Sequence, residues 1–94
     1  MRVAWSGAAL FHLEEIADYL EERNPTAAHR VVNAIYSKAQ ALLSENPEIG
    51  RKGRISGTRE LVVTGTRYIV AYRVTDRVEI LAVIHAAREW PDDF

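Results

Sequence analysis

The stretch YIVAYRVTDRVEILAVI, residues 68–84, decides the fold. Its first part, Tyr68 to Val74, is apolar at both alternating sets of positions. This pattern favours a strand that is buried on both faces, near the centre of a sheet. Thr75 and Asp76 form a tight connection, and Val78 to Ile84 is again β-branched and nearly all apolar. The stretch therefore predicts two neighbouring antiparallel strands.

Two further short strands are predicted upstream of this pair. Arg59 to Val63 lies just before it, with Gly65 in the intervening turn, and Arg2 to Trp5 lies near the start of the chain. The last three strands form an antiparallel meander, because short connections favour pairing between neighbours in sequence.

Two helices are predicted between the first strand and the meander. Ser6 is a suitable N-cap for the first helix, and Asn24 followed by Pro25 suits the start of the second. The short connection makes the helices pack antiparallel as a hairpin that ends by Asn46 and Pro47. Each helix has an apolar face with spacings of three and four residues: Leu10, Leu13, Ile16, Ala17 and Leu20 in the first, and Ala28, Val32, Ile35, Ala39 and Leu42, widened by Val31 and Leu43, in the second.

The sequence thus predicts one α+β domain over residues 1–94: a strand, an antiparallel two-helix hairpin, and a three-stranded antiparallel meander. The hairpin packs on one sheet face. The other face is expected to be open to a ligand or partner, apart from the C-terminal tail, where Trp90 and Pro91 prevent regular structure.

Charge is distributed unevenly, although the net charge is only −1. Residues 50–73 contain six basic residues and one acidic residue, and part of this region is a long loop, Glu45 to Thr58, rich in glycine and proline. A basic loop suggests a surface for an anion or an acidic peptide. The alternative is a set of solvated arginines with no ligand.

Several function classes are disfavoured. The chain has no cysteine, no apolar leader and no membrane-length apolar run, so a cytoplasmic protein without membrane contact is expected. His12 and His29 have no third ligand at metal spacing, and no nucleotide-binding fingerprint is present. We therefore expect neither a metal nor a cofactor.

The ordered set of motifs resembles the RelE/ParE toxin superfamily over nearly the whole chain. The resemblance covers Trp5-Ser6 with the helix Leu13 to Tyr19, the loop Pro47 to Arg51, Arg54 to Val63, the strands Tyr68 to Val74 and Val78 to His85, and the tail Ala86 to Pro91. It implies the toxin half of a type II toxin–antitoxin pair, closer to the ParE branch.

The ParE resemblance implies a protein that acts by binding DNA gyrase or a related type II topoisomerase. It also implies a cognate ParD-like antitoxin with an acidic, amphipathic segment and a hetero-oligomer formed with it. On this reading the partner-binding residues are expected to be Arg51, Arg54, Arg59, Arg73, His85, Arg88 and Trp90.

The alternative is a RelE-like, ribosome-dependent mRNA endoribonuclease. Arg51, Arg54 and Arg59 would then hold phosphates, His85 would act as acid, and Glu48 or Glu60 as base. The nuclease branch commonly has an arginine three residues before the central tyrosine, but this position is Ile69, and the tail lacks the closing tyrosine or histidine–tyrosine pair. Both departures favour ParE.

Some of these residues are equally compatible with a purely structural role. His85 alternates with apolar residues, as a half-buried structural histidine would, and Trp5 and Trp90 suit core anchors as well as contact residues. A third functional reading is a degenerate toxin, retained for its antitoxin-binding surface.

Overall fold

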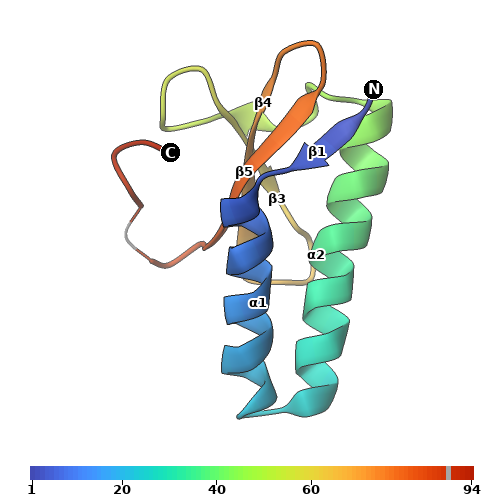
Figure 1. Cartoon of the computed structure of the whole chain (residues 1–94), viewed down its shortest axis with the longest axis vertical. Coiled ribbons are helices and arrows are strands. Elements are labelled where there is room, and N and C mark those ends of the chain that lie inside the picture. The colour runs from blue at the N-terminus through green and yellow to red at the C-terminus, as the bar shows by residue number, and fades with distance from the viewer. Residues whose placement is uncertain (89) are drawn as a thin grey trace.

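A computed structural model of the chain describes residues 1–88 and 90–94. Figure 1 shows a two-helix hairpin beside a twisted sheet, and the α+β class is confirmed. The elements in chain order are β1 (Val3–Trp5), α1 (Gly7–Glu21), α2 (Pro25–Glu45), β2 (Arg51–Lys52), β3 (Arg59–Val62), β4 (Tyr68–Val74) and β5 (Val78–His85).

The five strands have the order β1-β5-β4-β3-β2. The meander β3-β4-β5 is antiparallel, as predicted, and β4 lies at the centre. β1 pairs in parallel with the first three residues of β5, Val78 to Ile80. β2 is an addition to the prediction; it pairs Arg51 with Glu60 and Lys52 with Arg59. A strand of two residues has no periodic pattern, so it could not be recognised inside the long loop.

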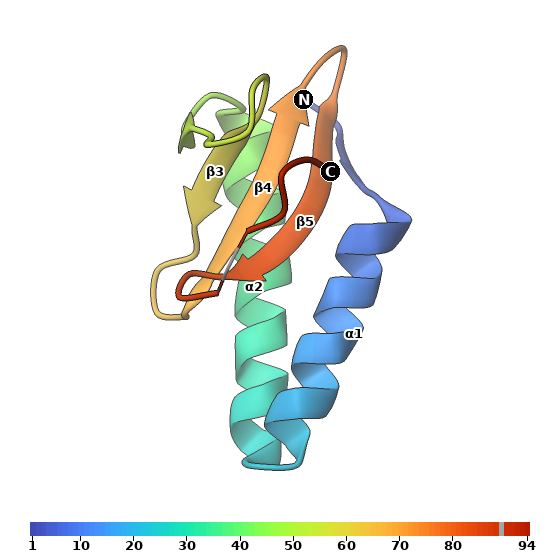
Figure 2. The same ribbon diagram turned by 90° about the vertical axis from the view of Figure 1, so that its left-hand side faces the viewer.

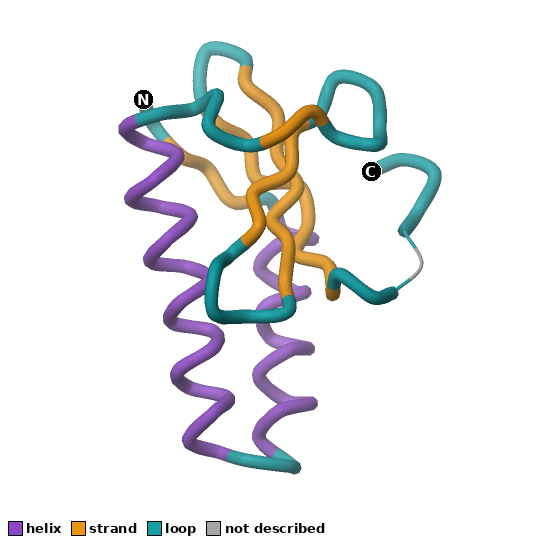
Figure 3. Tube along the Cα trace, turned by 180° about the vertical axis from the view of Figure 1, so that it is seen from behind, coloured by secondary structure: helices purple, strands orange, loops and turns teal. Residues whose placement is uncertain are grey.

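Both helices begin where their caps were predicted. The Ser6 side chain accepts a hydrogen bond from the Ala9 amide at 3.0 Å, and the Asn24 side chain accepts one from the Ala27 amide at 3.2 Å. The two helices run side by side and antiparallel (Figure 3). These side-chain oxygens satisfy amides that the first turn leaves without a helical partner.

The apolar face of each helix differs slightly from the prediction. In α1, Ala9 is fully buried, whereas Leu10 is 47% exposed. In α2, Val31 and Leu43 are buried, whereas Leu42 is 40% exposed. The apolar stripes are broader than one helix face, and the position of the sheet decides which edge of each stripe is buried.

The core lies between the hairpin and one face of the sheet. Tyr68 and Tyr72 on β4 point into it and pack with Ile35 and Leu43 of α2 and Ile80 of β5. Burying each large apolar side chain contributes about 1.5–3 kcal/mol before conformational entropy is counted. We call this the inner face of the sheet.

The opposite face, here called the outer face, is more covered than predicted. Ile69, Ala71 and Ala82 point away from the hairpin, yet each is at most 3% exposed. Figure 2 shows the C-terminal segment crossing in front of β4 and β5, with α2 behind them and α1 to one side. The tail was expected on this face, but the expectation that the rest of it is open was partly wrong, because the basic loop also lies over it. Among the described residues, no helix is long and apolar enough to cross a membrane.

Candidate functional site

A buried carboxylate organises the basic loop on the outer face. Glu60 of β3 is 3% exposed and lies directly across from Arg51 of β2. Arg51 donates to Glu60 Oε1 from Nε at 3.2 Å and from Nη2 at 3.1 Å. Arg54 donates to Glu60 Oε2 from its backbone amide at 2.9 Å and from Nε at 3.3 Å. A buried charge needs such partners, and here four donors supply them.

These contacts determine the protonation of Glu60. Burial alone would raise its pKa, but the Arg54 amide and the Arg51 and Arg54 guanidinium groups together lower the pKa below the ordinary value of 4.5. Glu60 is therefore ionised at neutral pH and is a poor candidate for the base of the nuclease alternative. Both guanidinium groups are already partly satisfied by it.

Trp90 belongs to the same cluster. The Arg54 guanidinium carbon lies 3.7 Å from the centroid of the Trp90 ring, a close cation–π arrangement. The Trp90 Nε1–H is buried and has no acceptor among the described residues. Trp90 thus joins the C-terminal tail to the basic loop.

Arg73 also lies on the outer face, at the far end of β4. It donates from Nε to Glu79 Oε1 at 2.8 Å, and Arg77 donates to Glu79 Oε2 at 3.4 Å. Glu79 is directly opposite Arg73 on β5. Like Arg51 and Arg54, this arginine is neutralised within the chain.

Arg59 points to the inner face, because it alternates with Glu60 along β3. Its Nη1 donates to Gly50 O at 2.9 Å and to Glu48 O at 3.3 Å, and Nη2 lies 3.9 Å from the Glu48 carboxylate. Arg59 therefore fixes the segment that follows α2. It is separated by the sheet from the Arg51 and Arg54 cluster.

His85 lies opposite Tyr68 at the start of β4, and Arg88 follows it in the chain. His85 is half-buried, its ring meets Tyr68 edge-on at 5.3 Å, and its Nδ1 accepts from the Ala87 amide at 3.1 Å. This matches the structural reading of the residue. The Arg88 guanidinium lies 5.9 Å from the ring of Tyr19 on α1.

The structure does not bring the four candidate nuclease residues together. Arg51 and Arg54 share Glu60 on the outer face, whereas Arg59 and His85 are on the inner side. Arg59 pairs with Tyr72 and His85 pairs with Tyr68, which places them four residues apart along β4, roughly 13 Å. RNA cleavage requires a proton acceptor beside cations that are free to bind the phosphate. These four residues do not form such an arrangement.

His12 is a residue that sequence reasoning left without a role. β1 pairs only with residues 78–80 of β5. Beyond residue 80, the edge of β5 that is not paired with β4 faces α1. There His12 Nδ1 accepts a hydrogen bond from the Val83 amide at 3.2 Å. No local pattern could predict this contact, which joins residues 71 positions apart.

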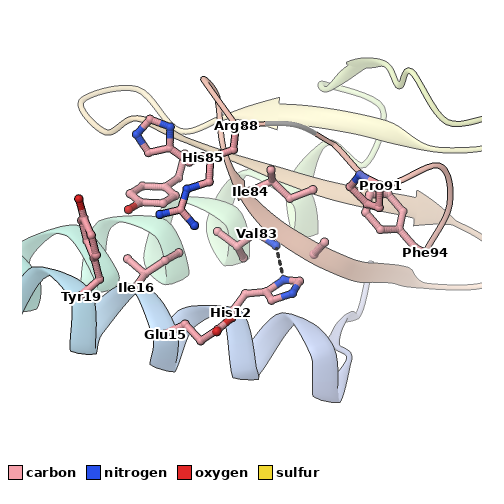
Figure 4. Close-up of a pocket in the computed structure, with 12 residues that line it drawn as sticks. His12, Glu15, Ile16, Tyr19, Val83, Ile84, His85, Arg88, Pro91 and Phe94 are labelled. Carbon is pink, nitrogen blue, oxygen red and sulfur yellow. Dashed lines mark hydrogen bonds between the residues drawn. The ribbon is translucent and has the colours of Figure 1, made fainter.

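A groove of about 400 Å³ opens beside this contact. Its walls come from α1, the end of β5 and the tail. Figure 4 shows His12 pointing at the Val83 backbone, with Tyr19, His85 and Arg88 gathered farther along the groove. Within residues 1–88 and 90–94, no group of three or more potential metal-binding residues comes together.

The fold and the internally paired arginines define a small α+β domain with a charged sheet surface. Residues 3–90 match the family model described as the ParE toxin of type II toxin–antitoxin systems, parDE. The chain belongs to this ParE toxin family. It is therefore the toxin of a type II toxin–antitoxin system, a class that has an antitoxin partner.

Individual relatives agree with the family match. The Sinorhizobium fredii protein Y4kP, named as a toxin, is 48% identical over 90 residues, which cover 96% of this chain and 93% of Y4kP. Toxin RelE2 of Caulobacter vibrioides is 39% identical over 88 residues, which cover 93% of this chain and 97% of RelE2. A solved structure titled as the chromosomal ParDE system from P. aeruginosa contains a similar chain, with a TM-score of 0.83. That match covers 90% of this chain and 95% of the other at 24% identity, which establishes a shared fold.

Proposed function

We propose that this toxin arrests growth by binding DNA gyrase or a related type II topoisomerase in the cytoplasm, and that a cognate ParD-like antitoxin neutralises it. The family match supports the toxin class, and the gyrase target follows from the resemblance to the ParE branch. No chemistry of its own is required, because a binding inhibitor needs only a complementary surface.

The separation of the candidate catalytic groups is the observation that carries this proposal. Arg51 and Arg54 are bound to Glu60 on one face, and His85 is bound to the Ala87 amide on the other side. Ile69, at the position where the nuclease branch commonly has an arginine, is 3% exposed and cannot supply a charge. The side chains therefore suit recognition better than acid–base catalysis.

The proposed partner-binding surface has two parts. Arg51, Arg54, Arg73 and Trp90 form the outer part, where the side chains of Arg51, Arg54 and Arg73 are 47–56% exposed although paired. His85 and Arg88 belong to the inner part, and Arg59 supports the loop that presents the outer part. A half-exposed guanidinium that is already oriented by a carboxylate can still donate its remaining N–H groups to a partner.

A supercoiling assay with purified components tests the proposal. Gyrase, relaxed plasmid and ATP are incubated with the toxin, and the topoisomers are resolved by electrophoresis. We expect loss of supercoiling, and recovery when the antitoxin is added before the toxin. Full supercoiling in the presence of excess folded toxin would contradict the proposed target.

A RelE-like endoribonuclease remains the second candidate, because the relative from Caulobacter vibrioides carries the name RelE2. This candidate predicts cuts in mRNA at the ribosomal A site, detected by primer extension after the toxin is added to translating ribosomes. Cleavage without an effect on gyrase would replace the first proposal. A toxin retained only to bind antitoxin would be inactive in both assays and harmless when expressed alone.

A further inference from the structure

Four arginines gather in a cleft that the sequence did not single out. The helical hairpin projects past the lower edge of the sheet (Figures 1 and 2). In the angle between them is a cleft of about 640 Å³, formed by the end of α1, the start of α2, the turn between β3 and β4, and the chain after β5. We call it the arginine cleft, after Arg23, Arg30, Arg67 and Arg88 in its walls.

The charge in this cleft is unbalanced. Its lining includes no aspartate or glutamate among the described residues. In the described part of the chain, Arg30, Arg67 and Arg88 have no carboxylate within 4.0 Å, and Arg23 only reaches Glu22 at 4.0 Å. Bringing several guanidinium groups together without a counter-charge is unfavourable, and a bound anion would relieve it.

The contrast with the outer face is direct. There Arg51 and Arg54 have Glu60, and Arg73 has Glu79, so an incoming carboxylate must compete with an internal one. In the arginine cleft an incoming carboxylate meets Arg30, Arg67 and Arg88, which form no such pair within residues 1–88 and 90–94. By charge complementarity, the cleft is therefore the better acceptor for an acidic partner.

The cleft also has an apolar and aromatic wall. Its lining includes the aliphatic side chains of Leu20 and Val31 and the aromatic rings of Tyr19 and Tyr68. The Arg23 guanidinium lies 3.8 Å from the Tyr19 ring centroid, and its Nη1 donates to the Tyr19 carbonyl at 2.8 Å. Arg23 is thus held in place, and the mixed wall suits a segment with both apolar and acidic side chains.

We propose that the arginine cleft binds an acidic, amphipathic segment of the antitoxin, whose carboxylates pair with Arg30, Arg67 and Arg88. This inference rests on the toxin–antitoxin part of the proposed function. The arginine cleft continues into the groove beside His12, because the two cavities share the lining residues Tyr19, Tyr68, His85 and Arg88. The two cavities together form one path beside α1.

A peptide fits better than a nucleic acid. α1, which forms one wall, has a strongly acidic exposed surface beside the cleft, including Glu14, Glu15 and Asp18, and Glu22 follows at its C-cap. A nucleic acid strand has a phosphate at every nucleotide and would meet these carboxylates as it left the cleft. A peptide can place its acids only where the arginines are and present neutral or basic residues to α1.

The test compares two double charge reversals in the full chain. The first, Arg30→Glu with Arg67→Glu, changes two cleft arginines whose side chains make no hydrogen bond or ion pair among the described residues. The matched control, Arg2→Glu with Lys52→Glu, changes the net charge equally at exposed positions outside the cleft. Circular dichroism and the thermal midpoint confirm that both variants are folded.

Affinity for the antitoxin, produced from the reading frame adjacent to the toxin gene, is then measured by calorimetry. We expect the cleft variant to bind about 30-fold more weakly or worse, which corresponds to about 2 kcal/mol, and the control to change by less than about threefold. Equal losses in both variants, or no loss in the first, would overturn the proposal.

Two further measurements separate this inference from its alternatives. In the supercoiling assay the cleft variant should inhibit gyrase as wild type does, but the antitoxin should no longer reverse the inhibition. If the wild-type toxin has no effect on gyrase, the proposed target is contradicted, while the affinity comparison still tests the cleft. A fluorescent single-stranded oligo-dT tests the other ligand class. Binding that depends on Arg30 and Arg67, combined with unchanged antitoxin affinity, would make the cleft a nucleic acid site and overturn the proposal.

Discussion

The hydroxyl of Tyr72 accepts a hydrogen bond from the backbone amide of Gly50 at 2.9 Å. The same hydroxyl donates to the carbonyl of Pro47 at 2.7 Å. A Cβ at residue 50 would lie only 2.6 Å from the Tyr72 oxygen, so the close approach requires glycine. A core tyrosine of the central strand thus positions the start of the basic loop.

Replacing Tyr72 by Phe should test this arrangement. The variant keeps the buried ring but leaves the Gly50 amide without its partner, so we expect a loss of about 1–3 kcal/mol in the free energy of unfolding. Urea denaturation followed by circular dichroism measures it. A loss as small as that of Tyr36→Phe, whose exposed hydroxyl makes no hydrogen bond among the described residues, would show that the Tyr72 contact is unimportant.

The Glu60 carboxylate should contribute to stability in a pH-dependent way. Its pKa is lowered in the folded state, so its contribution is present above the ordinary value of 4.5 and is lost as the pH falls through the folded-state pKa. Glu60→Gln should cost about 2 kcal/mol at pH 7. The difference from wild type should shrink below about pH 4.5.

Urea titrations of both proteins from pH 3 to pH 7 provide the measurement. Glu45→Gln, at an exposed position at the end of α2, serves as the control and should have little effect throughout. A Glu60→Gln penalty that does not vary with pH would mean that side-chain shape, and not charge, accounts for the loss.

The His12 side chain should stabilise the outer edge of β5. His12→Ala leaves the Val83 amide without its acceptor, and we expect a loss of about 1 kcal/mol because water can partly replace the imidazole at this half-buried site. Hydrogen exchange of the Val83 amide should accelerate at the same time. His29→Ala, at an exposed position on α2, serves as the control and should leave both the stability and the exchange rate unchanged. Unaltered exchange at Val83 in His12→Ala would show that His12 does not protect this edge of β5.

Trp90 should matter more for function than for folding. Trp90→Ala removes the ring against which Arg54 packs, an interaction of about 0.5–2 kcal/mol that orients the guanidinium on the proposed partner surface. We expect a weaker inhibition of gyrase with little change in the thermal midpoint. Inhibition equal to that of the wild-type toxin would show that the tail is not part of the partner-binding surface.

Sequence reasoning predicted the elements whose causes are local. Ser6 and Asn24 cap their helices because their side chains reach amides three residues away, and the buried outer-face residues Ile69 and Ala71 confirm that β4 is apolar on both faces. It missed the two-residue β2 and the packing of the basic loop over the outer face. Both depend on pairing across the fold and have no periodic signal.

The site was less predictable, because neighbours in sequence can lie on opposite sides of a sheet. Arg59 and Glu60 are adjacent, yet one supports the loop after α2 and the other binds Arg51 and Arg54. The cleft arginines come from four separate segments, and of these only Arg88 was among the expected partner-binding residues. Charge counting located a basic region but could not show which arginines are already neutralised within the chain.

Titration of gyrase with the purified toxin tests most directly whether the protein acts by binding. Supercoiling activity is measured at fixed gyrase concentration as toxin is added, with antitoxin added at the end. A binding inhibitor should reach full inhibition only near or above equimolar toxin, and the antitoxin should restore activity. Unchanged supercoiling at saturating toxin, accompanied by mRNA cleavage at toxin concentrations far below that of the ribosomes, would contradict the account.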